Sequence, residues 1–289
     1  MEIDPAGAWL PAPGKLNLFL HVLGRRPAEP GSGMQAGMHE LQTVFRLVDR
    51  CDRVWVRARD DREIRFSGDF GEDNLCVRAA RLLQAESGAA RGAELALDKV
   101  LPVGGGMGGG SSDAATVLLA LNRLWGLRLP REQLMRIGLR LGADVPFFVF
   151  GRSALGEGVG ERLSALDLPP AWYVVLVPQV SVSTKEIFQD PALTRDTKPL
   201  KIPPFLPGQG RNDLQGVAAR RYPEIATLLD RLRRWHPEAR MTGSGACVFA
   251  GFGTSEEAQA CLRGVSSGRD AVAGFVARGL DRHPLYDWA

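Results

Sequence analysis

Six glycines stand within the seven residues from Gly104 to Gly110, inside the stretch LPVGGGMGGGSSDAATVLLALNRLW. Ser111 and Ser112 follow directly, and an apolar run with good helix formers comes next. Backbone N–H groups at the start of a helix can surround an anion, and the helix dipole favours the negative charge. A simple turn needs only one or two glycines, so the stretch predicts a phosphate-binding loop rather than a flexible turn.

Two common phosphate loops do not fit this stretch. It contains GxGxxG from Gly104 to Gly109, but a dinucleotide-binding fold also needs an acidic residue about 20 residues further on, where this chain has NRLWGLRLPREQL. Gly105 and Gly110 have the spacing of a Walker A loop, but Ser111 stands where the lysine of GxxxxGK[ST] belongs. Another residue must therefore supply the positive charge.

Two charged residues far from the loop are candidates for the reacting end of such a site. Phosphoryl transfer to an alcohol needs a group that orients the hydroxyl and accepts its proton, and a cation that neutralises the phosphoryl oxygens. Asp144, in LGADVPFF, stands ahead of an expected apolar strand and can project into a cleft, although capping of a helix or turn is the alternative. Lys15, in PGKLNLFL, enters an apolar strand whose packing does not require a lysine, and an ordinary surface position is its alternative.

Alternating strands and helices would position these residues. In the first half, apolar periodicity predicts strands over 15–22, 53–58 and 93–97 and helices over 74–85, 112–125 and 130–141. The second half shows a strand over 172–178, an irregular segment over 199–210, a helix over 224–234, a glycine turn and strand within 239–252, and a helix over 256–265. The pattern predicts an α+β fold with a domain boundary between 158 and 168.

Composition excludes several classes of protein. Lys and Arg number 36 against 33 Asp and Glu, and the two signs are interspersed, so we expect no nucleic-acid partner. The four cysteines form no CxxC pair and are expected to be reduced, apolar thiols. No long uninterrupted apolar run and no leader segment is evident. We therefore expect a cytoplasmic protein without membrane contact, either a monomer or a weak homodimer.

Three sequence blocks, in order, resemble the GHMP kinase superfamily: PAPGKLNLFLHVLGRR, PVGGGMGGGSSDAA and MTGSGACVFAGF. Further stretches, HELQTVF, EDNLCVRAARLL, LGADVPFF and GEGVGE, are similar to the 4-diphosphocytidyl-2-C-methyl-D-erythritol kinases within it. The resemblance implies a two-domain fold, with a ribosomal-protein-S5-domain-2-like N-terminal domain over 1–160 and a ferredoxin-like α/β sandwich over 161–289. It also implies an activity that uses ATP and Mg²⁺ to phosphorylate the 2-hydroxyl of 4-diphosphocytidyl-2-C-methyl-D-erythritol, in the non-mevalonate (methylerythritol phosphate) isoprenoid pathway.

The resemblance further implies roles for single residues. Lys15 and Asp144 become the catalytic pair, with Lys15 holding the acceptor hydroxyl or favouring the charged carboxylate, and with Asn17 beside them in the acceptor site. The metal ligands stay open, with the hydroxyl of Ser111 or Ser112 as a candidate. Helix capping is the alternative for Asn74. The residues expected to bind ATP are Asn74, Lys99, Pro102, Val103, Gly104, Gly105, Gly106, Met107, Gly108, Gly109, Gly110, Ser111 and Ser112.

A second group of residues is expected to bind the diphosphocytidyl substrate. His39 matches a histidine that contacts the cytosine, and Phe188 matches an aromatic residue that stacks on the base. This chain departs from the family in two ways: the segment before His39, RRPAEPGSGMQAGMH, is longer than the usual RADGYH, and Met38 stands where a tyrosine is expected. The remaining substrate-site residues are Thr184, Gly243 and Ser244, the last two within a glycine turn expected to pack beside the first loop, with a plain β-turn as the alternative.

Two other functions remain open at this point. Another small-alcohol kinase of the superfamily would act on mevalonate, homoserine or a sugar, and a pocket for cytosine would have no purpose there. A catalytically silent nucleotide-binding regulator would have the same fold. The retained Lys15 and Asp144 argue against it.

Overall fold

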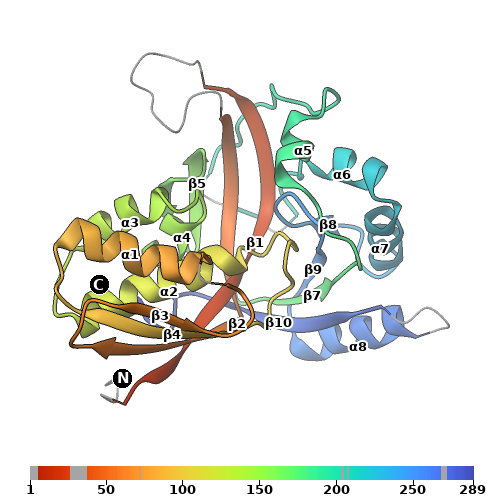
Figure 1. The fold of residues 1–289 in the computed structure, drawn as a ribbon. Coiled ribbons are helices and arrows are strands. Elements are labelled where there is room, and N and C mark those ends of the chain that lie inside the picture. Colours follow the sequence, from red (N-terminus) through yellow and green to blue (C-terminus); the bar gives the residue numbers. More distant parts are fainter. Residues whose placement is uncertain (1–5, 27–37, 72, 203–204, 207, 268–271) are drawn as a thin grey trace.

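Two long antiparallel strands organise the molecule, whose computed structural model describes residues 6–26, 38–71, 73–202, 205–206, 208–267 and 272–289. Strands β1 (Ala8–Arg25) and β2 (His39–Arg59) pair from Ala8 opposite Val56 to Arg25 opposite His39. Figure 1 shows them rising between helices α1–α4 on one side and α5–α7 on the other. The sequence predicts only 15–22 within β1 and 53–58 at the C-terminal end of β2, because strict alternation of apolar residues does not extend over the full length of either strand.

The first half builds a sheet covered by helices. Strand β4 pairs with β2 and β3, and β5 pairs with β2 and β6. The core between the sheet and α2 is apolar, and eleven residues of α2 are buried. The remaining elements of this half are β3 (Ile64–Ser67), α1 (Leu75–Ser87), β4 (Gly92–Asp98), α2 (Gly109–Leu124), α3 (Arg131–Leu139), α4 (Val145–Phe150), β5 (Ala154–Gly158) and β6 (Arg162–Ala165).

The second half has the predicted ferredoxin-like topology. Its four strands lie in the order β10-β7-β9-β8, all neighbours are antiparallel, and α8 connects the third strand in the chain to the fourth. Helices α5 and α6 are not predicted from the sequence, since each is only one to two turns long. The elements are β7 (Trp172–Leu176), α5 (Thr184–Gln189), α6 (Gln215–Arg221), α7 (Pro223–Arg233), β8 (Arg240–Met241), β9 (Val248–Phe252), α8 (Ser255–Ser266) and β10 (Gly274–Leu280).

Strand β10 joins the two halves into one hydrogen-bonded sheet. It pairs with β7 along its length and, at its end, Gly279 and Leu280 pair with Val48 and Leu47 of β2. The chain then returns to the first half through the short helix η2 (Tyr286–Trp288), where Leu285 and Trp288 enter the core. The domain division at residue 160 stays a prediction, and the β5–β6 hairpin spans it.

The apolar strand expected after Asp144 is wrong, because the sequence VPFFVF forms helix α4. A short apolar run cannot be assigned to strand or helix by periodicity alone. Two residues are compatible with the helix: Pro146 lies in its first turn, where the missing N–H is harmless, and Gly151 ends it with a φ of 71°.

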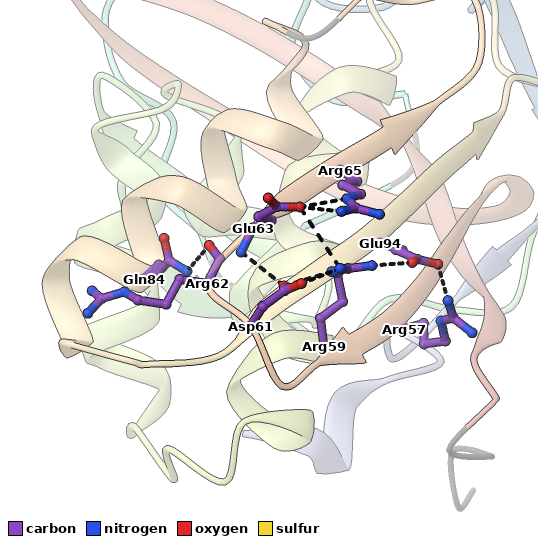
Figure 2. Close-up of polar contacts among 8 residues, drawn as sticks. All are labelled: Arg57, Arg59, Asp61, Arg62, Glu63, Arg65, Gln84 and Glu94. Atoms are coloured by element: carbon purple, nitrogen blue, oxygen red, sulfur yellow. Dashed lines mark hydrogen bonds and ion pairs between the residues drawn. The ribbon is translucent and has the colours of Figure 1, made fainter.

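The outward face of β2, β3 and β4 carries paired charges (Figure 2). Arg57 and Arg59 both contact Glu94, at 2.6 Å each, and Arg59 also pairs with Asp61. Hydrogen bonds from Arg59 lower the pKa of Asp61 to about 2. Because these arginines face carboxylates, this surface lacks the one-signed charge that a polyanion would need.

Two further expectations concern the cysteines and the membrane. All four cysteines are free, and burial raises the pKa of Cys247 to about 12, so it stays a thiol as expected. Of the helices in the described ranges, none has the length and apolar character needed to cross a bilayer.

Candidate active site

A cavity of about 860 Å³ lies where α2 begins, bordered by β1, β2, the starts of α1 and α4, one side of α5 and the second glycine turn. Every residue predicted for the site borders it except Ser112. The chain therefore brings together the residues predicted for the phosphate loop, the catalytic pair and the base pocket, from segments as distant in sequence as Lys15 and Ser244.

The glycine loop adopts backbone conformations that side chains would hinder. Gly104, Gly106 and Gly108 have φ values of 69°, 77° and 71°, in the left-handed region that favours glycine. Helix α2 begins at Gly109 with no side-chain cap, and its first backbone bond runs from the N–H of Ser112 to Gly108 O. The preceding amides are left for an anion at the positive end of the helix dipole.

The second glycine turn packs against the first, as predicted. The N–H groups of Ala246 and Cys247 donate to Gly104 O at 3.2 Å and to Gly105 O at 3.1 Å. A Cβ at Gly106 would lie 2.2 Å from Thr242 O, so only glycine permits this approach. The alternative of a β-turn also describes this backbone, since Gly245 N–H donates to Thr242 O at 3.1 Å, and the same turn packs against the loop.

Two buried residues that the sequence analysis missed hold this second turn. Asn212 donates to Met241 O and Gly243 O at 2.8 Å each, while its side-chain oxygen accepts from Leu214 N–H at 3.0 Å. Thr242 accepts from the backbone N–H of Asn17 at 2.9 Å. Asn212 lies in a segment without periodicity, where asparagine is expected to serve its own turn, so no pattern pointed to it.

Lys15 and Asp144 face each other, with 3.5 Å between Lys15 Nζ and Asp144 Oδ2. Lys15 is 3% exposed, so the surface alternative is wrong, and its ammonium donates to Asn17 Oδ1 at 2.5 Å. Asn17 in turn donates to Thr43 Oγ1 at 2.9 Å, which fixes the amide. Asp144 makes no capping hydrogen bond, and its side chain is 35% exposed toward the cavity. The arrangement presents a cation and a carboxylate to one bound group.

Lys99 lies beneath the loop in a buried ion cluster. Its ammonium contacts Asp52 and, at 2.9 Å, Asp113, while Asp52 accepts the N–H groups of Val100 and Leu101. Burial, together with the neighbouring Asp52, raises the pKa of Asp113 to about 7, against the opposing effect of Lys99. Lys99 also borders the cavity, so the ammonium that pairs with these two carboxylates is also accessible to a ligand bound there.

Asn74 has the capping role that was its alternative. Its side-chain oxygen accepts the N–H groups of Cys76 and Val77 at 2.9 and 3.2 Å, at the start of α1. The same side chain borders the cavity. Beside it, the cavity wall is apolar, formed by Phe70, Leu75 and Leu97, which the sequence analysis did not single out.

The side chains of the two serines after the loop lie in different surroundings. Ser112 is fully buried, and its hydroxyl donates to Pro13 O at 2.7 Å, away from the cavity. Ser111 borders the cavity and remains the candidate hydroxyl for a metal. Within the described ranges, no group of three or more His, Cys, Asp or Glu side chains is arranged to hold a metal ion by itself.

His39 and Phe188 meet in the wall of the cavity, with ring centroids 4.9 Å apart and ring planes inclined by 34°. Burial, followed by the nearby Arg25 and Arg195, lowers the pKa of His39 to about 4. Met38 is 36% exposed beside them. Thr184 and Ser244, from the two predicted substrate segments, share a hydrogen bond of 2.7 Å between their hydroxyls.

Comparisons with known proteins agree with this geometry. The models named "GHMP kinases N terminal domain" and "GHMP kinases C terminal" match residues 74–152 and 205–269. A 4-diphosphocytidyl-2-C-methyl-D-erythritol kinase of Thiobacillus denitrificans is 56% identical over 96% of this chain and 97% of its own length. The enzyme of the same name from Ralstonia pickettii is 56% identical, over 96% of each chain.

Solved structures of kinases also resemble this chain. A crystal structure of 4-(cytidine 5'-diphospho)-2C-methyl-D-erythritol kinase matches with a TM-score of 0.79 and 33% identity, over 94% of this chain and 99% of that one. A homoserine kinase from Cytophaga hutchinsonii matches with a TM-score of 0.71 and 17% identity, over 98% and 97% of the two chains, and supports the fold alone. The chain belongs to the 4-diphosphocytidyl-2-C-methyl-D-erythritol kinase family of the GHMP kinases.

Proposed function

We propose that this protein transfers the γ-phosphoryl group of ATP to the 2-hydroxyl of 4-diphosphocytidyl-2-C-methyl-D-erythritol, a step of the methylerythritol phosphate route to isoprenoid precursors. The observation that carries the proposal is the Lys15–Asp144 pair, 3.5 Å apart, in the cavity that also contains the uncapped start of α2. A phosphate held by those amides and a hydroxyl held by this pair would lie in one enclosed volume.

Asp144 orients the acceptor hydroxyl and takes its proton as the oxygen attacks the γ-phosphorus. The bond between that phosphorus and the oxygen bridging to the β-phosphate breaks, and ADP leaves with the electron pair. Lys15 neutralises the charge on the transferring group. Its chain passes under the loop, since a Cβ at Gly108 would lie 3.2 Å from Lys15 Cε. Asn17 holds the ammonium in this position through the 2.5 Å contact.

The loop amides from Gly106 to Ser111 bind the β- and γ-phosphates of ATP. Since the described residues offer no cluster of metal ligands, Mg²⁺ would be held mainly by phosphate oxygens of ATP, and Ser111, which borders the cavity, would supply a hydroxyl ligand. When bound, Mg²⁺ neutralises charge on the phosphates. The apolar wall formed by Phe70, Leu75 and Leu97 suits a flat base and would take the adenine.

The cytosine of the acceptor lies between Phe188 and the segment that carries Met38, and His39 contacts its edge. These three residues border the cavity, and the rings of His39 and Phe188 are in contact. Mevalonate, homoserine and simple sugars carry no base, so this group of residues favours the diphosphocytidyl substrate over the other small alcohols of the superfamily. The intact Lys15–Asp144 pair argues against a silent regulator.

Steady-state ADP release with the diphosphocytidyl substrate tests the proposal, with mevalonate and homoserine as comparison acceptors. His39→Ala and Phe188→Ala should raise KM for the diphosphocytidyl substrate and leave KM for ATP unchanged, each by the equivalent of about 1–3 kcal/mol. Met38→Tyr should hold or lower that KM, because an aromatic ring stacks better on a base. Trp235→Ala, half exposed and outside the cavity, is the control. Turnover of another alcohol without turnover of the diphosphocytidyl substrate would refute the proposal.

A further inference from the structure

The imidazole of His39 receives two N–H donors on the same nitrogen. Arg195 Nε lies 3.1 Å and Arg25 Nε 3.2 Å from His39 Nε2. A guanidinium group only donates hydrogen bonds, so Nε2 must offer its lone pair to both groups. The ring proton of neutral His39 therefore resides on Nδ1. The described residues supply no further hydrogen-bond partner for this ring, which borders the cavity.

Arg195 is itself held in one position by three backbone carbonyls. Its Nη2 donates to Phe188 O and Asp190 O at 2.8 Å each, and its Nη1 donates to Leu193 O at 3.1 Å. One side chain therefore ties the end of α5, which carries Phe188, to the first residue of β2, which is His39. The two residues expected to hold the base share this support.

The surroundings of the His39 ring favour its neutral form. Two guanidinium groups next to Nε2 oppose protonation of the imidazole, and burial acts in the same direction. When His39 is neutral with its proton on Nδ1, that atom is the one ring nitrogen that can donate a hydrogen bond to the edge of a base. Cytosine has an acceptor at N3, whereas uracil has an N–H there, so a donor fixed opposite that position distinguishes the two bases, while a donor to O2 would bind both.

We propose that Arg195, assisted by Arg25, is a positioning residue that fixes His39 as an Nδ1–H donor and thereby makes the base pocket select cytosine over uracil. The inference rests on the proposed function for the identity of the substrate. The state of the imidazole does not depend on that function, so the two claims can be tested separately.

The first test is ¹⁵N NMR of histidine-labelled protein without substrate, with the His39 signals assigned by their loss in His39→Gln. We expect the Nδ1–H form alone in the wild type and a mixture of both neutral forms in the double variant Arg25→Met, Arg195→Met. An Nε2–H form or a mixture in the wild type would overturn the proposal, whatever the enzyme's activity.

The second test compares kcat/KM for the diphosphocytidyl substrate and its diphosphouridyl analogue. Arg195→Met should lower the preference for cytosine by about 10-fold or more, through KM of the cytidyl substrate, with KM for ATP unchanged. Arg221→Met is the matched control, because Arg221 contacts Asp190 near the end of α5 at 3.3 Å and lies away from the cavity. An unchanged base preference in folded Arg195→Met would overturn the proposal.

If Arg195→Met fails to fold, Arg25→Met replaces it as the test variant. Arg25 also donates to His39 but makes no contact with α5 among the hydrogen bonds described. It should also reduce the preference for cytosine. If wild-type enzyme does not phosphorylate the diphosphocytidyl substrate at all, the proposed function fails, and the NMR result still decides the state of His39.

Discussion

Lys15 is a buried ammonium group whose partners all border the cavity. Burial of a charge is unfavourable unless it is paired and hydrogen-bonded, and Asn17, Asp144 and the ring face of Phe45, 5.6 Å from the ammonium, meet that need. A lysine in a purely structural position would be expected to lie at the surface with its head in water. The local packing therefore supports the catalytic assignment independently of the resemblance.

Asp144→Asn should lower kcat by about 100-fold or more, because the amide cannot accept the hydroxyl proton. ATP affinity should change little, since the loop amides are intact. Steady-state kinetics, with nucleotide binding measured by titration, checks both parts.

Asp167→Asn is the matched control, because the Asp167 side chain is 97% exposed and contacts only Arg152 among the pairs described. It should behave as wild type. Near-normal turnover in Asp144→Asn would remove this carboxylate from the mechanism.

At the residue scale, the sequence predicted which side chains border the site better than it predicted what they contact. Lys15, Asp144, His39 and Phe188 could be named because motif blocks carry them. The contact of Lys99 with two carboxylates and the inward turn of Ser112 depend on residues 47 and 99 positions away in sequence, which no local pattern encodes. Arg195 was missed for the same reason.

At the scale of elements, the start of α2 separates two adjacent serines onto different sides of one helix. Residues one apart on a helix do not share a face, so Ser111 meets the cavity while Ser112 meets β1. Ser111 is therefore accessible to a ligand in the cavity, whereas Ser112 stabilises the fold.

Ser112→Ala should lower the free energy of unfolding by about 1–3 kcal/mol, because Pro13 O loses its buried partner. Ser111→Ala should leave stability nearly unchanged and raise KM for MgATP. Urea denaturation and steady-state kinetics on the two variants check this pair. Equal stability losses in both variants would contradict the assignment.

Elements with strong caps or breakers could be predicted, and those without them could not. Helix α1 begins after Asn74 and ends before Gly88, close to the expected bounds. The glycine turn beside the loop was expected and is present. Helix α4 was predicted as a strand, because six apolar residues show no period and their helical form depends on packing against α2 and α3.

At the scale of the whole molecule, the last residues close the structure. Arg131, from α3, donates to Phe150 O at 3.2 Å and to Ala289 O at 2.9 Å, and its guanidinium lies 4.3 Å from the ring centroid of Tyr286. His283 is buried, and its Nδ1 accepts from Leu285 N–H at 3.0 Å. Burial, with Arg131 nearby, lowers the pKa of His283 to about 3.

The burial of His283 predicts that the free energy of unfolding falls in acid. It is neutral in the folded state and takes up a proton on unfolding below its ordinary pKa of about 6.5, so the stability it contributes is complete above that pH and falls as the pH is lowered. Between about pH 7.5 and pH 5, one such group lowers the free energy of unfolding by about 2 kcal/mol.

His283→Asn keeps an acceptor for Leu285 N–H and removes the titrating ring. Urea denaturation at both pH values should show a smaller loss in the variant than in the wild type, by about that amount. The same loss in both proteins would show that His283 is not responsible.

The insertion of Leu285 and Trp288 into the core of the first half has a consequence for how the protein is made. A ribosome delivers the chain from its N-terminus, and early domains usually fold while later ones are still being synthesised. Here the first half cannot complete its core until Leu285 and Trp288 have left the ribosome, and the edge of β2 stays unpaired until β10 has been made. During synthesis the glycine loop would thus rest on an unfinished support until these late segments are added.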